Sequence, residues 1–191
     1  MRKFYLLLLL IVSVSITAQQ IREIQISQNG KKTIVHLEIN GTFLSMDTDG
    51  NISQINSNQK GNMKLNEQTT GTFQGDVEID YDDPKSISTK KGYFDYYDDF
   101  YSYRSGKLKS VDDISIEYYD GFYSYQNGKL KSIGNLKFTY FDGFYDYQKG
   151  KLKSINNLEF TYYDDFYKYR SGKLKSIKGN NNKIQITVFN D

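Results

Sequence analysis

The sequence has no cysteine, no tryptophan, one histidine and one proline among its 191 residues. Without cysteine the chain can form no disulfide, thiol nucleophile, zinc finger or iron–sulfur cluster. The one histidine, His36 in the run TIVHLEI, has no second histidine or cysteine with which to share a metal. We interpret it as a half-exposed strand residue. We therefore expect neither a metal ion nor a cofactor.

The sequence also lacks a large excess of charge of one sign. Lys and Arg number 25 and Asp and Glu 23, which gives a formal net charge of +2, and both extra positive charges, Arg2 and Lys3, stand at the extreme N-terminus. The rest of the chain is neutral and has no electrostatic signature of nucleic-acid or anionic-membrane binding. We expect no nucleic-acid partner.

Residues 1–18, MRKFYLLLLLIVSVSITA, have the three parts of a secretory signal: positive charges, an apolar run and small or polar residues ending at Ala18. The apolar run is short for a membrane span. We predict cleavage after Ala18 and export to the periplasm, the cell surface or the medium, without transmembrane insertion of the mature chain. A retained N-terminal anchor is the alternative.

The second half of the chain is an internal repeat with a period of 22 residues. GKLKS begins at Gly106, Gly128, Gly150 and Gly172, and each copy follows an aromatic FYxY motif. We predict one domain over residues 19–191: N-terminal strands and a cap over 19–76, hairpin repeats over 77–177, and a C-terminal capping strand over 178–191.

The repeat has the composition of β-strands, because Tyr, Phe, Ile and Thr favour a pleated surface. We predict an all-β fold, an antiparallel meander of stacked β-hairpins in an open or curled single sheet. Two-residue turns at Asp142-Gly143 and Lys149-Gly150 would gather the aromatic side chains on one face. Asn156-Asn157 is then expected to be a bend in a continuing strand, and Asn29-Gly30 marks a further hairpin.

Two columns of tyrosines recur with the period, and they are the candidate binding residues. These tyrosines can be interpreted in two ways. They either pack in the core or form an exposed aromatic ladder that binds a protein or glycan partner, since tyrosine combines a flat apolar ring with a hydroxyl. The apolar face must be covered by curling of the sheet, by the N-terminal strands or by another molecule. The columns are Tyr101, Tyr123, Tyr145 and Tyr167, and Tyr103, Tyr125, Tyr147 and Tyr169.

The run YFDGFYDYQKGKLKSI resembles the bacterial variant of MORN-type repeats through Tyr125 and Asn127-Gly128-Lys129-Leu130. It is also similar to the tyrosine-aspartate repeats of Rhs-like surface proteins through Tyr145-Asp146 and Gly150-x-Leu152. The resemblance covers residues 77–177. It implies a hairpin array that serves as a scaffold or contact surface in larger assemblies, and it carries over no catalytic residues.

Candidate catalytic chemistry is limited to three pairs of aspartates, Asp98-Asp99, Asp112-Asp113 and Asp164-Asp165. Paired carboxylates among aromatic residues are typical of glycoside hydrolysis, but Asp is also a turn residue, and a turn is the interpretation we favour. DTDGN at residues 47–51 is likewise interpreted as a turn rather than a calcium loop.

We predict an exported, non-enzymatic β-repeat protein that acts as a binding or scaffold module at the cell envelope. A small secreted glycan hydrolase that uses an aspartate pair is one alternative. An outer-membrane β-barrel is another, although lysines alternate on one face of the repeat and tyrosines on the other, so that neither face makes a clean lipid band.

Overall fold

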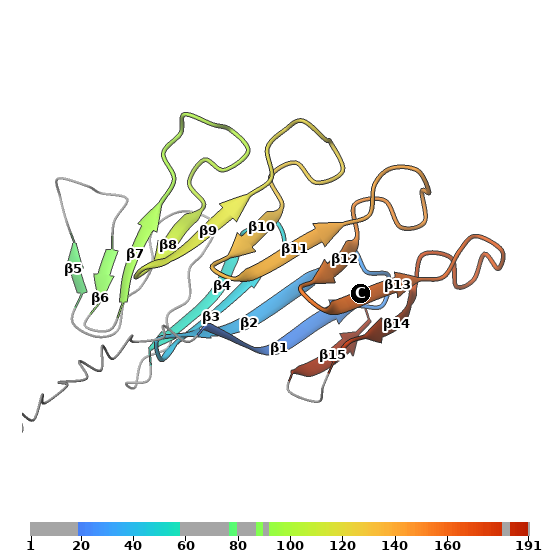
Figure 1. The fold of residues 1–191 in the computed structure, drawn as a ribbon, viewed down its shortest axis with the longest axis horizontal. Helices are drawn as coiled ribbons and strands as arrows, with labels where there is room; N and C mark the ends of the chain where they lie inside the picture. Colours follow the sequence, from blue (N-terminus) through green and yellow to red (C-terminus); the bar gives the residue numbers. More distant parts are fainter. Residues whose placement is uncertain (1–18, 58–76, 80–86, 90–91, 181–183, 191) are drawn as a thin grey trace, which may run out of the picture.

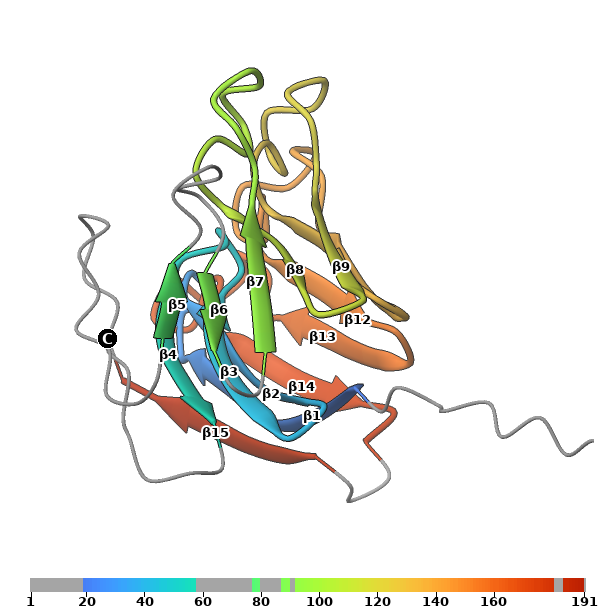
Figure 2. The same ribbon diagram turned by 90° about the vertical axis from the view of Figure 1, so that its left-hand side faces the viewer.

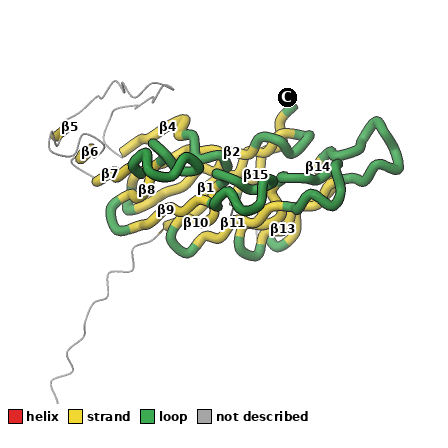
Figure 3. Tube along the Cα trace, turned by 90° about the horizontal axis from the view of Figure 1, so that it is seen from above, coloured by secondary structure: helices red, strands yellow, loops and turns green. Residues whose placement is uncertain are grey.

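The computed structural model describes residues 19–57, 77–79, 87–89, 92–180 and 184–190. The expected signal segment, its cleavage site and most of the polar stretch that follows the first strands lie outside these residues. The described part is all β, as predicted, with fifteen strands in two sheets and no helix (Figures 1 and 3). It accordingly contains no helix with the length and apolar character needed to cross a membrane.

The N-terminal residues form a five-stranded sheet with the order β15-β1-β2-β3-β4. The predicted hairpin at Asn29-Gly30 is confirmed, since β1 and β2 flank it as an antiparallel pair. The C-terminal strand β15 lies parallel to β1 in this sheet rather than against the repeats. The strands are β1 (Gln19–Ser27), β2 (Thr33–Ile39), β3 (Thr42–Asp47), β4 (Ile52–Ser57) and β15 (Gln185–Phe189).

The repeats form a ten-stranded sheet in which strands follow one another in chain order from β5 to β14. The predicted antiparallel meander of successive hairpins is confirmed, and the sheet is open, with β5 and β14 at its edges. Its strands are β5 (Val77–Ile79), β6 (Ile87–Thr89), β7 (Gly92–Tyr96), β8 (Leu108–Val111), β9 (Ile114–Tyr118), β10 (Leu130–Ile133), β11 (Leu136–Tyr140), β12 (Leu152–Ile155), β13 (Leu158–Tyr162) and β14 (Leu174–Lys178).

The predicted positions of the turns within each repeat are wrong. Asn156-Asn157 is a tight two-residue turn, with Ile155 paired to Leu158, and not a bend. The two expected glycine turns instead lie in one long loop between β11 and β12. Phe141 closes this loop: its N–H donates to the Lys151 carbonyl at 3.0 Å and its carbonyl accepts from the Gly150 N–H at 3.0 Å.

A β-bulge in each GKLKS strand explains why simple alternation failed. In β12 the register shifts so that Tyr140 pairs with Leu152 and Thr139 with Ser154, which leaves Lys153 as an extra residue. The bulge turns both Leu152 and Ile155 into the core, where both are buried, although alternation would place them on opposite faces. Equivalent shifts occur at the other three copies of the motif.

The five-stranded sheet packs against one face of the repeat sheet, so the expected single sheet becomes part of a two-layer structure (Figure 2). One core unites Ile24 and Leu37 of the first sheet with Phe138 and Phe160 of the second. Of the three ways to cover the apolar face of the repeats, the structure uses the N-terminal strands.

Backbone hydrogen bonds and close turns fix the two layers in register. The Leu130 N–H donates to the Thr48 carbonyl at 2.7 Å, and the Leu174 N–H donates to the Gln28 carbonyl at 2.8 Å. Beside each of these hydrogen bonds, a turn of the N-terminal sheet places a glycine in close contact with a buried tyrosine. Gly50 lies against Tyr118, and Gly30 lies against Tyr162.

Candidate binding surface

Four long loops connect successive strands of the repeats, and all four project from the same end of these strands (Figure 1). We call them the aromatic loops. Each is closed at its base by the pair of backbone hydrogen bonds described above for Phe141. The loops comprise residues 98–105, 120–127, 142–149 and 164–171, and they connect β7 to β8, β9 to β10, β11 to β12 and β13 to β14.

An aspartate begins each aromatic loop and stabilises its first turn. The Asp142 Oδ1 accepts a hydrogen bond from the Phe144 N–H at 3.1 Å, and Asp98, Asp120 and Asp164 make the same contact in their own loops. This is the local hydrogen bonding that makes aspartate a turn residue. The turn interpretation is therefore confirmed for Asp98 and Asp164.

The first and the last aromatic loops, which we call the outer loops, each have a second aspartate that also accepts a hydrogen bond within its loop. The Ser105 hydroxyl donates to Asp99 at 2.5 Å, and Ser171 donates to Asp165. Asp112 instead lies in the turn between β8 and β9, at the opposite ends of the strands, where its Oδ1 accepts from the Tyr93 N–H at 2.9 Å. The three aspartate pairs are thus not brought together.

All eight tyrosines of the predicted ladder lie in the aromatic loops and not on strands. Those of the first column are about half exposed, from 45 % at Tyr167 to 52 % at Tyr123. In the second column Tyr103, Tyr125 and Tyr147 are partly buried against the edge of the core, whereas Tyr169 is exposed. The rings of the two columns lie 5.7 to 5.9 Å apart within each loop.

The sequence interpretation missed the most exposed aromatic side chain of each loop, the phenylalanine of the FYxY motif. Its exposed fraction is 79 or 80 % in every copy, and its ring lies edge-on to the following tyrosine with centroids 4.6 to 4.7 Å apart. Its recurrence with the period was the available signal. The residues are Phe100, Phe122, Phe144 and Phe166.

Hydrogen bonds join the base of the first aromatic loop to that of the second, and the base of the third to that of the fourth. The Lys107 Nζ donates to the carbonyl of Gly128, at the base of the next loop, at 2.6 Å, and Lys151 makes the same contact with Gly172. Burial lowers the pKa of both lysines, although nearby aspartates partly oppose the shift. The Tyr119 hydroxyl adds a further link, donating to the Phe138 carbonyl at 3.0 Å.

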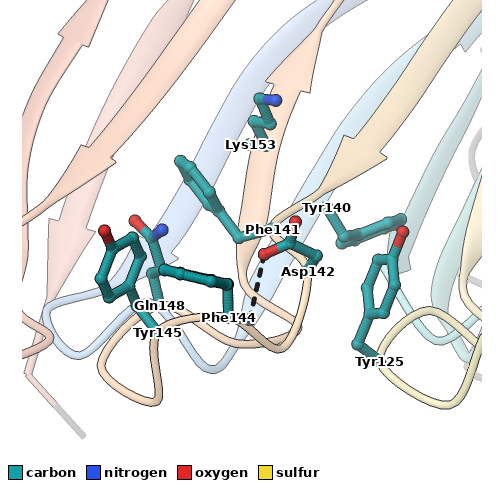
Figure 4. A pocket seen from close by; sticks show the side chains of 8 residues that line it. All are labelled: Tyr125, Tyr140, Phe141, Asp142, Phe144, Tyr145, Gln148 and Lys153. Carbon is teal, nitrogen blue, oxygen red and sulfur yellow. Dashed lines mark hydrogen bonds between the residues drawn. The ribbon is translucent and has the colours of Figure 1, made fainter.

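A hollow of about 390 Å³ lies between the second and third loops (Figure 4). Tyr125 of the loop 120–127 faces Phe144 and Tyr145 of the next loop across it, with Asp142 between them. Gln148 and, on β12, Lys153 complete its polar lining. The site therefore combines aromatic ring faces with one acid, one amide and one ammonium group.

The outer loops differ from the inner ones by carrying an arginine among their own rings. The Arg104 guanidinium lies 4.3 Å from the centroid of Tyr97 and 4.7 Å from that of Tyr101, and Arg170 stacks equivalently in the last loop. The inner loops have Gln126 and Gln148 at this position. The inner rings thus have a neutral amide where the outer rings contact a cation.

No metal centre emerges from the described residues, which contain no group of three or more His, Cys, Asp or Glu side chains placed to hold an ion. The DTDGN segment is the turn between β3 and β4, in which the Asp47 Oδ1 accepts from the N–H groups of Asp49 and Asn51. His36 pairs with the Ser45 hydroxyl at 2.6 Å.

Comparisons of this chain with models of protein families, with curated proteins and with solved structures found no match. The repeated β-hairpins do not by themselves identify MORN-type or Rhs-like repeats. The resemblance to these families stays a prediction, and the function has to be argued from the aromatic loops themselves.

Proposed function

We propose that this chain is an exported, non-enzymatic module of the cell envelope that binds a protein or glycan partner through its aromatic loops. The observation that carries the proposal is the exposure of the four loop phenylalanines, 79 or 80 % in every copy. Large, strongly exposed apolar side chains at equivalent positions of neighbouring loops are characteristic of an interaction site, because a partner that covers them gains the free energy of burying their apolar surface.

The rigidity of the loops supports a binding role. Asp142 fixes the first turn, and Lys151 ties the loop 142–149 to the next one. A partner would therefore meet rings that are already in place, which lowers the entropic cost of association. Loops that needed only to connect two strands would require neither these contacts nor the repeated exposed rings, because shorter turns already join β8 to β9 and β12 to β13.

The absence of excess charge also fits such a role. Aromatic rings make up much of the proposed binding surface. Lys131 and Glu117, on neighbouring strands below the loops, neutralise each other in an ion pair at 3.1 Å. Contact would depend on stacking and hydrogen bonding and would be only weakly sensitive to salt. Export itself rests on the predicted signal at residues 1–18, and the intact mass of secreted material tests it, since a mass that retains this segment contradicts cleavage.

The binding test uses cell envelopes of the producing organism and a variant in which all four loop phenylalanines are replaced by serine. We expect the native chain to cosediment with the envelopes and the variant to stay in solution. Tyr93→Ser is the matched control, because Tyr93 is also an exposed aromatic residue but lies on β7 outside the aromatic loops. Equal sedimentation of the native and fourfold variant chains, both folded by circular dichroism, would reject the proposal.

A further inference from the structure

We infer that the hollows between adjacent aromatic loops are consecutive subsites for one neutral, linear polysaccharide. This inference rests on the proposed function and deepens it by naming the class of ligand. It starts from the hollow between the loops 120–127 and 142–149, whose lining is both aromatic and polar.

The lining matches the chemistry of a sugar ring. A pyranose has apolar C–H faces, which stack on aromatic rings, and a rim of hydroxyl groups, which both donate and accept hydrogen bonds. Phe144 and Tyr145 offer the ring faces (Figure 4). Asp142 offers acceptors, Lys153 offers donors, and the Gln148 amide offers both.

The charge of the hollow favours a neutral ligand. Asp142 and Lys153 contribute one negative and one positive charge, so the lining as a whole attracts neither an anion nor a cation. A purely cation-binding aromatic cage would not include an ammonium group, and a site for an acidic polymer would not begin with a carboxylate.

The ligand is inferred to be a polymer because the site repeats along the sheet. The residues that line the hollow recur 22 positions earlier as Tyr103, Asp120, Phe122 and Gln126. Each repeat adds two strands, so equivalent groups at the bases of the loops are spaced about 10 Å apart. A polysaccharide presents the same chemistry at regular intervals, whereas the surface of a folded protein does not. The periodicity therefore favours a glycan over a protein.

The hollow is open on the solvent side, as a polymer requires. Phe144 is 79 % exposed and Tyr145 about half exposed, so that a chain can pass from one loop to the next without a free end having to enter. Contacts repeated along one chain add their free energies, so that affinity rises steeply with ligand length.

The subsites are not all equal. At the repeat position of Gln148 the preceding loop carries Gln126, whereas the last loop carries Arg170, whose guanidinium already stacks on Tyr163 and Tyr167. The inner subsites should therefore bind a neutral sugar more strongly than the last one.

The test measures binding of the secreted chain to soluble mixed-linkage β-glucan, xyloglucan and galactomannan, with the acidic polymer alginate for comparison, by affinity electrophoresis and calorimetry. We expect at least one neutral polymer to bind, longer oligosaccharides of it to bind more tightly than short ones, and alginate not to bind. Phe122→Ala and Phe144→Ala should each weaken binding roughly five- to thirtyfold. Phe166→Ala should weaken it less, Phe144→Tyr should preserve it, and Tyr93→Ala should leave it unchanged.

Failure of all three neutral polymers to bind, tighter binding of alginate, or affinity unaffected by the loop substitutions in folded protein would overturn the inference. Failure of this inference can be told from failure of the proposed function. If the chain sediments with envelopes through its loop phenylalanines but loses this when the envelopes are treated with protease, the partner is a protein and only the glycan inference falls. If sedimentation does not depend on the phenylalanines, both fall.

Discussion

The Lys151 Nζ donates a 2.6 Å hydrogen bond to the backbone carbonyl of Gly172, in the next copy of the repeat. The same ammonium group lies 5.0 Å from the centroid of the Tyr162 ring. One side chain thus joins two aromatic loops and a buried tyrosine that touches the N-terminal sheet at Gly30. An equivalent bond from Lys107 to the Gly128 carbonyl joins the first two loops, so that the contacts between loops can be tested one pair at a time.

The glycines at the ends of the aromatic loops should differ in their tolerance of a side chain. Gly172 and Gly106 both have left-handed backbones, with φ of 70° and 67°, so replacing either by alanine costs about 1 kcal/mol of strain. A β-carbon at Gly172 would also lie 2.9 Å from the Tyr147 carbonyl oxygen, whereas at Gly106 it meets nothing within 4 Å. Gly172→Ala should therefore lower the free energy of unfolding by about 1 to 3 kcal/mol more than Gly106→Ala.

Urea denaturation of the two glycine variants supplies the comparison. Equal losses of stability would mean that neighbouring loops can separate enough to admit the extra carbon. The loops would then not form the fixed row on which the proposed binding surface depends.

Removing the hydroxyl group of a buried tyrosine should lower the free energy of unfolding of the protein. The Tyr140 hydroxyl donates to the Leu130 carbonyl at 2.9 Å and the Tyr162 hydroxyl to the Leu152 carbonyl at 2.9 Å. Tyr140→Phe or Tyr162→Phe leaves a buried carbonyl with one partner fewer, which costs about 0.5 to 1.5 kcal/mol. Tyr145→Phe is the matched control, because the Tyr145 side chain is about half exposed. Thermal unfolding measures the three stabilities. A loss for Tyr145→Phe as large as for the two buried tyrosines would contradict the role of the buried hydroxyl groups.

Stability should decline at alkaline pH. Burial raises the pKa of Tyr118, Tyr140 and Tyr162 above the ordinary tyrosine value. These groups stay protonated in the folded chain, while in the unfolded chain they lose their protons near pH 10, so the unfolded state binds fewer protons above that pH. The stability that they contribute is complete below about pH 10, and each can remove up to about 1.4 kcal/mol per pH unit above it.

A tyrosinate absorbance titration recorded with circular dichroism tests this pH dependence. The exposed tyrosines should ionise first, and the three buried ones only as the β-sheet signal is lost. The triple variant with phenylalanine at these positions should show a shallower loss of stability above pH 10. Ionisation of all tyrosines in one step within a folded protein would show that these rings are accessible.

The bulge residue Lys153 should be dispensable for the stability of the core. Deleting it leaves Leu152 and Ile155 two positions apart, so that simple alternation keeps both on the core face and preserves their cross-strand pairs with Tyr140 and Phe138. The deletion should therefore cost less than the loss of a core side chain, which is about 2 to 5 kcal/mol. Lys153→Ala keeps the bulge and should change stability by less than about 0.5 kcal/mol. Chemical denaturation in which the deletion costs as much stability as Leu152→Ala would contradict this prediction and show that the bulge itself holds the register.

Much of the fold could be predicted because the signals were local and repeated. Strand-forming residues between turn residues, recurring every 22 positions, predict an antiparallel meander, and Asn29-Gly30 predicts its hairpin. The register could not be predicted, because several turn signals compete in each repeat. Asn156-Asn157 and Asp142-Gly143 are both plausible hairpin turns, and only the bulge at Lys153 and the docking of the N-terminal sheet decide between them.

At the candidate site too, one property of the tyrosine columns could be predicted from the sequence and another could not. Periodicity identified Tyr145 and Tyr147 as a recurring pair, and their rings do lie together, 5.7 Å apart. The predicted turns placed both on one face of a sheet, however, because the alternation of side chains was counted through a segment that is a loop. Phe144, the most exposed ring of that loop, was consequently not among the predicted binding residues.

The sequence by itself determined that the chain is β-structured, repeats with a fixed period, lacks cysteine chemistry and gathers its aromatic residues in equivalent positions, because each of these properties resides in local composition and spacing. Only the tertiary structure decided which aromatic residues are core and which are surface. That choice depends on where the five-stranded sheet packs: it buries Phe138 and Tyr162, and the loops that extend beyond its edge keep Phe144 and Phe166 in water.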